Sequence, residues 1–331
     1  MGGARIGALL LALACAVAGG PAAAAPPGRV VSINLCTDQL AMMLAAPGQL
    51  VSVSALAADP RASAMAAEAA GLALNRGRAE EVFLMRPDLV LAGTYTARGS
   101  VDLLRRLGFA IVELPPAQGL GDIAAQLRAV GAALGREAEA ERAVAAFEAD
   151  LAALSVAGGA RAAAVLYYPN GYTPGAGTLA DDILRVTGFR NLGAEAGVTG
   201  GGTLPLERLV LAAPDLIVTS EPYPGASRSE EILSHPALRA VRAWARAAEV
   251  SDADWLCGTP HILRAVATMA AARRAIGAIE LSCSQPSARW SRHFSPPRSR
   301  SGRRGRRSGR AARPHPSSCA RSGCRAPSSA R

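Results

Sequence analysis

The chain contains no lysine and four histidines, and aromatic residues make up only 4% of its 331 residues. It also lacks the short motifs of several enzyme classes: a Walker phosphate loop, a G-x-S-x-G nucleophile elbow and an H-E-x-x-H zinc site. One glycine-rich stretch, "GVTGGGTLP", follows no clear strand and lacks the Rossmann spacing. These absences argue against nucleotide-dependent, α/β-hydrolase and zinc-peptidase chemistry. We therefore predict a protein that is not an enzyme.

Long apolar runs are missing as well. The N-terminal segment has one positive charge at Arg5, an apolar run over residues 6–17 and then a small-residue stretch. This layout is typical of a secretory signal peptide, and the run is too short to span a bilayer comfortably. We expect residues 1–25 to be a signal peptide and the mature protein to be periplasmic. A lipoprotein acylated at Cys15 is the alternative, although Ala12 stands where a large aliphatic residue is expected.

The opposite end, residues 283–331, contains 13 arginines and no acidic residue. The whole chain carries a net charge of +10, so removing those thirteen positive charges leaves −3 for the rest. An export signal and only two bulky aromatics in the tail, Trp290 and Phe294, argue against a nucleic-acid partner. We predict a disordered tail, because it has almost nothing apolar to bury. The absence of lysine suggests a GC-rich gene, so a frameshift product is a further interpretation of this tail.

Between these ends, short aliphatic runs alternate with helical patterns, as in α/β proteins. Near-continuous aliphatic runs are expected for strands of a parallel sheet that is covered on both faces. The predicted strands are "RVVSIN", "LVSVSA", "DLVLAG", "FAIVELP", "AAAVLYY" and "DLIVTS". A long amphipathic segment over about residues 120–154 separates the two halves, with Gly131 and Gly135 inside it. Each half contains the same unit, "AEEVFLMRPDLVLAG" or "LERLVLAAPDLIVTS", which predicts two lobes of related design.

Together with "NLCTDQLAMMLA", "ADDILRVTGFRNL" and "DADWLCGTPHI", these segments resemble the substrate-binding proteins of bacterial ABC importers for cobalamin, ferric siderophores and haem. The resemblance implies an α/β fold with two similar lobes, parallel sheets and a ligand cleft between the lobes. It places an N-terminal lobe at residues 26–119, one long linking helix at 120–156 and a second lobe at 157–282. It also implies a monomer without a cofactor, which captures a metal chelate and docks transiently on a membrane ABC permease.

Ligands of open α/β sheets lie beyond the carboxyl ends of the strands. Four loops are candidates for that position, and by resemblance all four face the cleft. The candidate ligand-binding residues on them are Asn34, Cys36, Thr37, Tyr95, Tyr168, Tyr172, Asp254, Trp255 and His261. Asp254 and Trp255 match a cleft Asp-Trp pair of the cobalamin-binding relatives, although a packing Trp beside a helix-capping Asp is the alternative. Tyrosines on loops are common binding anchors, but Tyr168 could equally be a core residue at a strand end.

Cysteine is scarce in the predicted folded body, which keeps only Cys36 and Cys257. In an exported protein two such cysteines predict a disulfide, and closing so long a loop could stabilise the fold by about 4 to 5 kcal/mol. The rival interpretation is a metal site made by Cys36, Cys257 and His261, with the last two spaced C-x3-H. That site would make the chain a direct metal-ion binding or storage protein. Free thiols are the third possibility.

Overall fold

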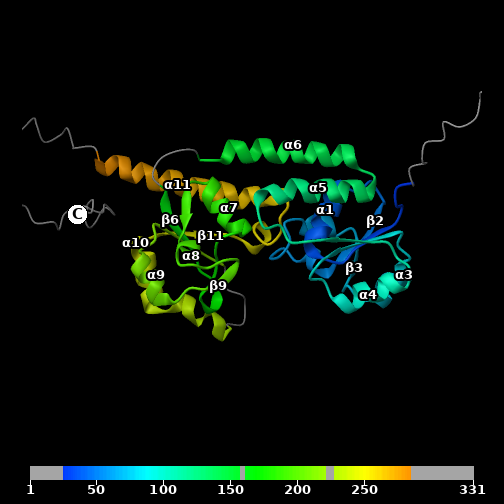
Figure 1. Ribbon diagram of the computed structural model, residues 1–331, viewed down its shortest axis with the longest axis horizontal. Helices are drawn as coiled ribbons and strands as arrows, with labels where there is room; N and C mark the ends of the chain where they lie inside the picture. The colour runs from blue at the N-terminus through cyan, green and yellow to red at the C-terminus, as the bar shows by residue number, and fades with distance from the viewer. Residues whose placement is uncertain (1–24, 157–160, 221–226, 285–331) are drawn as a thin grey trace, which may run out of the picture.

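The computed structural model describes residues 25–156, 161–220 and 227–284. Apart from Ala25, the predicted signal peptide lies outside these residues, and so does the predicted tail beyond Ser284. None of the helices in these ranges is long and apolar enough to cross a membrane. Figure 1 shows two α/β lobes side by side, with long helices running along one side of both. The predicted fold class, two α/β lobes with parallel sheets, is confirmed.

The N-terminal lobe is built on a five-stranded, fully parallel sheet. Its strands, in the spatial order β3-β2-β1-β4-β5, are β1 (Val30–Ser32), β2 (Leu50–Ser54), β3 (Ala73–Asn75), β4 (Leu89–Gly93) and β5 (Ile111–Leu114). Its helices are α1 (Leu35–Leu44), α2 (Ala66–Ala69), α3 (Ala79–Met85) and α4 (Arg98–Arg106), with a short η1 turn (Ala55–Ala58). The chain moves outward in opposite directions from β1 and from β4. The boundary between these two strands is therefore the topological switch point of the sheet.

The second lobe has a four-stranded parallel sheet in the order β11-β10-β6-β8. Its strands are β6 (Ala162–Leu166), β8 (Phe189–Asn191), β10 (Leu216–Thr219) and β11 (Arg246–Glu249), with a separate antiparallel pair, β7 (Tyr172–Pro174) and β9 (Gly201–Thr203). Its helices are α7 (Leu179–Val186), α8 (Leu192–Glu195), α9 (Leu206–Ala212), α10 (Pro236–Trp244) and α11 (Leu263–Ser284). The short turns are η2 (Pro169–Gly171), η3 (Arg228–Ser234), η4 (Asp252–Asp254) and η5 (Pro260–Ile262).

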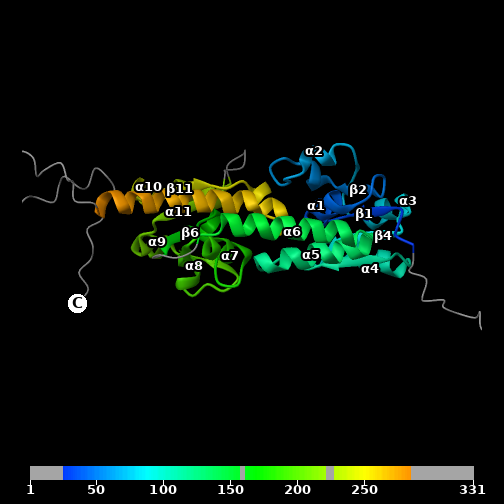
Figure 2. The same cartoon turned by 90° about the horizontal axis from the view of Figure 1, so that it is seen from above.

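The linking segment differs from the prediction of one long helix, which is wrong. It forms two helices, α5 (Leu120–Leu134) and α6 (Glu137–Leu154), that pack against each other. Gly135 ends α5 in the left-handed conformation, with φ of +67°, which glycine adopts without strain. Gly131 has no side chain and lets Ala140 of α6 approach closely. As a result α6 alone runs from one lobe to the other, while α5 lies over the first (Figures 1 and 2).

The repeated sequence unit has the same local structure in both lobes. In each, a short helix ends at a left-handed residue, Arg86 with φ of 48° or Ala213 with φ of 47°. An aspartate two residues later accepts hydrogen bonds at the start of a neighbouring strand. Asp88 accepts from the backbone N–H groups of Gly28 and Arg29, and Asp215 accepts from that of Ala163. The aspartate therefore aligns the start of its own strand with the adjacent one.

One continuous apolar core joins the lobes. It contains Val30 of β1, Leu127 of α5, Phe147 of α6, Leu166 of β6 and Met269 of α11, each 2% exposed or less. Figure 2 shows α11 and α6 side by side in the middle of the molecule. Smaller clusters cover the opposite face of each sheet, beneath α3 and α4 in the first lobe and beneath α9 and α10 in the second. Burial on both faces explains why most of the strands are continuous aliphatic runs.

Candidate ligand site between the lobes

A pocket of about 110 Å³ lies at the carboxyl ends of β1, β4 and β5, at the switch point of the first sheet. Most of its lining comes from the first lobe: Asn34, Cys36, Thr37, Leu40, Gly93, Thr94, Tyr95, Leu114, Pro115, Pro116, Ala117 and Gln126. Three residues reach it from the second lobe side, Leu179, Leu256 and Gly258. None of these side chains is charged, so the pocket suits a neutral or apolar part of a ligand.

Asn34 holds in place the loop between β1 and α1, which forms part of the pocket wall. Its backbone is extended, and its side-chain oxygen accepts hydrogen bonds from the N–H groups of Cys36 and Thr37, at 3.0 and 3.4 Å. It is therefore the N-cap of α1. The amide nitrogen of Asn34 lies over Gly93, where an added Cβ would stand only 2.9 Å away. Thr37 is 1% exposed and its hydroxyl lies 2.8 Å from that of Ser32, so Thr37 acts mainly in positioning the loop.

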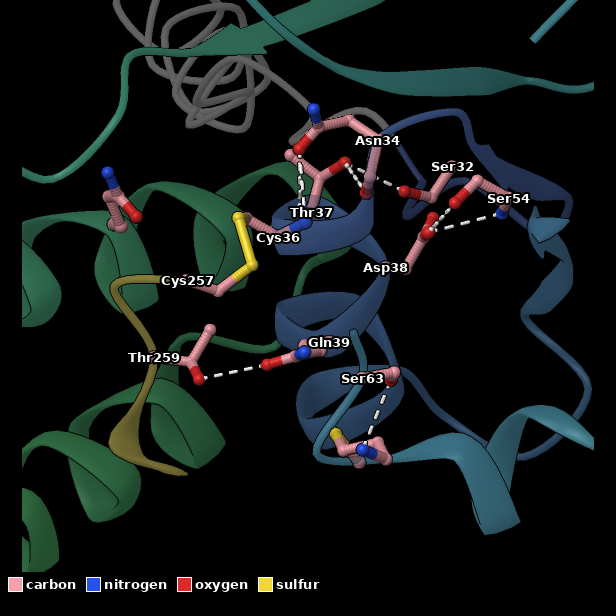
Figure 3. Close-up of a disulfide and its surroundings, with 12 residues drawn as sticks. Ser32, Asn34, Cys36, Thr37, Asp38, Gln39, Ser54, Ser63, Cys257 and Thr259 are labelled. Atoms are coloured by element: carbon pink, nitrogen blue, oxygen red, sulfur yellow. Dashed lines mark hydrogen bonds between the residues drawn. A yellow bond between two sulfur atoms is a disulfide. The ribbon is translucent and has the colours of Figure 1, made fainter. Parts of the chain in front are cut away.

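A disulfide in the wall of the pocket links the two lobes. It joins Cys36, in the first turn of α1, to Cys257, which lies 221 residues further along the chain (Figure 3). The Cα atoms are 5.1 Å apart, within the usual range for a disulfide. Cys257 is 3% exposed, whereas Cys36 is only half-buried and lines the pocket.

The residues that follow Cys257 also contact the first lobe. An added Cβ on Gly258 would lie 2.3 Å from the Cβ of Ala117, so the backbone of Gly258 packs directly against the methyl group of Ala117. The Thr259 hydroxyl donates to the side-chain oxygen of Gln39 at 3.0 Å (Figure 3). The segment 257–259 is therefore a second connection between the lobes, in addition to α6.

A buried acid lies one helical turn beyond Asn34. Asp38 is fully buried, and one carboxylate oxygen accepts hydrogen bonds from the N–H and the hydroxyl of Ser54, at 3.1 and 2.5 Å. Its other oxygen has no hydrogen-bond partner among the described residues. Burial raises the pKa of Asp38 to about 6, although the nearby hydroxyl of Ser32 and the hydrogen bonds from Ser54 oppose this shift. Sequence reasoning missed this residue, since a polar residue in a first helical turn usually faces solvent.

The predicted tyrosines lie in two different places. Tyr95 is 80% exposed and lines the pocket at the end of β4. Tyr168 and Tyr172 lie in the second lobe with ring centroids 6.3 Å apart, outside the lining of the pocket. Tyr168 packs against the main core, and burial raises its pKa, whereas Tyr172 is 47% exposed. Only Tyr95 is therefore placed for direct contact with a molecule in the pocket.

The remaining predicted residues surround the segment before α11 but do not line the pocket. Asp254 pairs with Arg264 at 3.1 Å, and Trp255 packs partly against the main core. His261 is half-buried, and its Nε2 has no hydrogen-bond partner within the described ranges. Burial lowers the pKa of His261, and the nearby guanidinium of Arg264 lowers it further. A direct role of these three residues in binding stays a prediction.

The alternative metal site of Cys36, Cys257 and His261 stays a prediction, and the structure pairs its two cysteines with each other instead. The sulfurs of Cys36 and Cys257 are bonded to each other, and a disulfide sulfur is not the thiolate that a metal requires. Within the described part of the chain, no group of three or more His, Cys, Asp or Glu residues could hold a metal ion. His261 is thus left without the partners that the prediction assigned to it.

Several residues of the pocket were not predicted, above all Pro115, Pro116 and Ala117. They follow β5, whose carboxyl end lies beside that of β4. Two consecutive prolines after a predicted strand were an available signal, because a strand that neighbours β4 brings its following loop to the same edge. Gln126 also lines the pocket, and its amide donates to the Pro115 carbonyl at 2.7 Å.

A protein-family model described as "Periplasmic binding protein" matches residues 30–247. This chain belongs to that family. The prediction from sequence is confirmed, and so is the expectation of a binding protein rather than an enzyme. The match to this periplasmic binding protein runs from β1 to within β11, and so covers both sheets.

A curated relative is the "Uncharacterized ABC transporter substrate-binding lipoprotein YvrC" of Bacillus subtilis (strain 168), 24% identical over 206 residues. The alignment covers 59% of this periplasmic binding protein and 64% of the relative, so the chain spans just under two thirds of that relative's length.

Solved structures show the same fold. The periplasmic heme-binding protein RhuT from Roseiflexus sp. RS-1 is 21% identical, with a TM-score of 0.62 over 75% of this chain and 98% of that one. The periplasmic vitamin B12 binding protein BtuF of Vibrio cholerae is 20% identical, with a TM-score of 0.59 over 76% and 98%.

Proposed function

We propose that this periplasmic binding protein captures a metal chelate, such as cobalamin, haem or a ferric siderophore, and delivers it to an ABC importer permease. The observation that carries the proposal is the uncharged pocket at the switch point, which residues of both lobes line. The relatives named above include heme-binding, vitamin B12 binding and ABC-transporter proteins, and they support the same class of ligand.

The dimensions of the pocket define how such a ligand binds. A pocket that encloses a drug-sized molecule has a volume of about 300 to 1,000 Å³, and this one is smaller. It therefore takes one edge or substituent of a chelate, while the larger remainder lies over the rim. Tyr95 and Leu256, which are 80% and 55% exposed, offer rigid and apolar surface at that rim.

In this proposal the chelate is the transported cargo, and the protein has no resident cofactor and no nucleic-acid partner. The protein is a monomer that docks transiently on the permease. The proposal places the protein outside the cytoplasm, in the periplasm. The curated relative is described as a lipoprotein, so acylation at Cys15 is a concrete alternative to a soluble periplasmic form. Metabolic labelling with a fatty acid, compared between the wild type and Cys15→Ser, separates the two.

Native mass spectrometry of the full chain, exported into an oxidising compartment, tests the proposal. The protein is incubated with cyanocobalamin, hemin and a ferric hydroxamate together, and a retained adduct identifies the ligand by its mass. Retention of a bare metal ion with none of the three chelates would overturn the proposal, as would retention of nothing.

Two matched variants then test the pocket. Removing the ring in Tyr95→Ala is expected to weaken binding of the retained chelate about tenfold, the effect of losing roughly 1.4 kcal/mol of aromatic contact. Leu211→Ala is the control, since Leu211 is 84% exposed on α9 and lies outside the pocket lining. Equal affinities of the two variants would place the ligand elsewhere.

A further inference from the structure

Of the two cysteines in the disulfide that links the lobes, only Cys36 lines the pocket. Cys36 lines the ligand pocket and is half-buried, whereas Cys257 is 3% exposed. We propose that Cys36 is a site of thiol–disulfide exchange, which small thiols reach through the pocket, and that any molecule occupying the pocket protects it. The protection by cargo rests on the proposed function, but the site of attack does not.

Neighbouring residues block the access of a thiol to Cys257. On its C-terminal side, Gly258 packs directly on Ala117, and Thr259 is hydrogen-bonded to Gln39 of α1. Figure 3 shows the sulfur–sulfur bond lying between α1 and the segment that leads into α11. A thiolate must approach along the line of the bond that it breaks. Of the two cysteines, Cys36 lines the pocket and Cys257 does not.

The exchange proceeds in two balanced steps. A thiolate attacks Sγ of Cys36, a mixed disulfide forms there, and the electron pair of the broken bond leaves on Sγ of Cys257, which takes a proton from solvent. A second thiolate attacks the outer sulfur of the mixed disulfide and releases Cys36 as a thiolate together with the oxidised reagent. Two thiols thus supply the two electrons.

Thiolate stability alone favours attack on Cys257, so attack on Cys36 would show that access decides which sulfur reacts. Cys36 lies at the N-terminus of α1, where a thiolate is stabilised, so Cys36 would be the better leaving group and Cys257 the better target. Access decides the outcome, because the buried sulfur of Cys257 cannot be reached from solvent without moving its neighbours.

Redox state and cargo binding are coupled as a result. Leu256 and Gly258 flank Cys257 and line the pocket, so breaking the sulfur–sulfur bond loosens that wall. A ligand that binds the oxidised form more tightly must in turn favour the oxidised form, since coupling between two sites is reciprocal.

The first test maps the attack on the full-length exported protein. Glutathione is added, the reaction is stopped with acid at early times, free thiols are alkylated, and the peptides are analysed by mass spectrometry. We expect glutathione on Cys36 and the alkyl group on Cys257. Glutathione on Cys257, or an equal mixture, would overturn the proposal, and this measurement needs no variant.

The second test fills the pocket. Thr94→Trp places a large ring at the pocket lining, and Ala138→Trp, on an exposed position of α6, is the matched control. The rate of reduction is expected to fall about tenfold in the first variant and to stay unchanged in the second, because access governs such rates. Equal rates would refute entry through the pocket. If Thr94→Trp protects but none of the three chelates binds, the exchange site stands and the proposed cargo falls.

Discussion

The close packing of α5 against α6 predicts that Gly131→Ala destabilises the protein, whereas Gly121→Ala in the same helix stabilises it. At Gly131, an added Cβ would lie 2.4 Å from the Cβ of Ala140 and 3.1 Å from the carbonyl oxygen of Arg136. Carbon atoms in contact lie about 3.5 to 4 Å apart, so α6 must move outward by about 1 Å. Overpacking of this kind costs about 1 to 3 kcal/mol, and the better helix propensity of alanine returns about 0.5 to 1 kcal/mol. Gly131→Ala should therefore lower the free energy of unfolding by up to about 2.5 kcal/mol.

Gly121 is the internal control, because it lies in the same helix and an added Cβ would meet nothing within 4 Å. Gly121→Ala should raise the free energy of unfolding by up to about 0.5 to 1 kcal/mol. Urea denaturation followed by circular dichroism measures both variants, with the slope checked for constancy. If residues 120–154 formed one rod, alanine would stabilise both positions. A stabilised Gly131→Ala would therefore refute the helical hairpin.

Three further predictions follow from the site. Replacing both Cys36 and Cys257 by serine should lower the melting temperature. The loss in the free energy of unfolding has an upper limit of about 5 kcal/mol for a loop of 221 residues. An unchanged melting temperature would exclude the disulfide in the exported protein. Because burial raises the pKa of Asp38 to about 6, the folded state binds a proton more tightly than the unfolded state does. The free energy of unfolding should therefore fall by about 2 to 3 kcal/mol as the pH rises from 4 to 7. Asp38→Asn should reduce this dependence on pH, as measured by urea titrations at each pH. Gly258→Ala forces its Cβ against Ala117, so it should weaken binding of the retained chelate without abolishing folding, and calorimetry beside melting curves would separate the two effects.

Strands that are rich in large aliphatic residues were predictable, and mostly exposed strands at sheet edges were not. β4 reads "LVLAG" and is buried throughout, as a central parallel strand requires. By contrast, β11 reads "RAAE" and is mostly exposed at a sheet edge, and β3 has only three residues. Neither carries enough apolar surface to stand out in the sequence. Without β3 the order of the first sheet, and hence its switch point, could not be derived.

Residues of the pocket could be predicted where they lie in a loop that directly follows a predicted strand. Asn34, Cys36, Thr37 and Tyr95 follow predicted strands, and all four line the pocket. The contribution of Gly258 depends on tertiary contact across more than a hundred residues, which no local pattern encodes. The turn at Gly135 was visible only as a glycine in an amphipathic pattern, and its left-handed conformation decides between one helix and two.

The shared core has a consequence for the order in which the fold can form. Val30, from the first described strand, and Met269, from the last described helix, belong to one apolar cluster. Contacts so distant in sequence require a large loss of chain entropy before they stabilise anything, and chains dominated by such contacts fold slowly. The second lobe cannot bury its share of that cluster until α11 has been synthesised, because α11 packs against α6, α7 and β11. The chain therefore stays incompletely folded while it is being made, which is the state that a secretion channel can still accept.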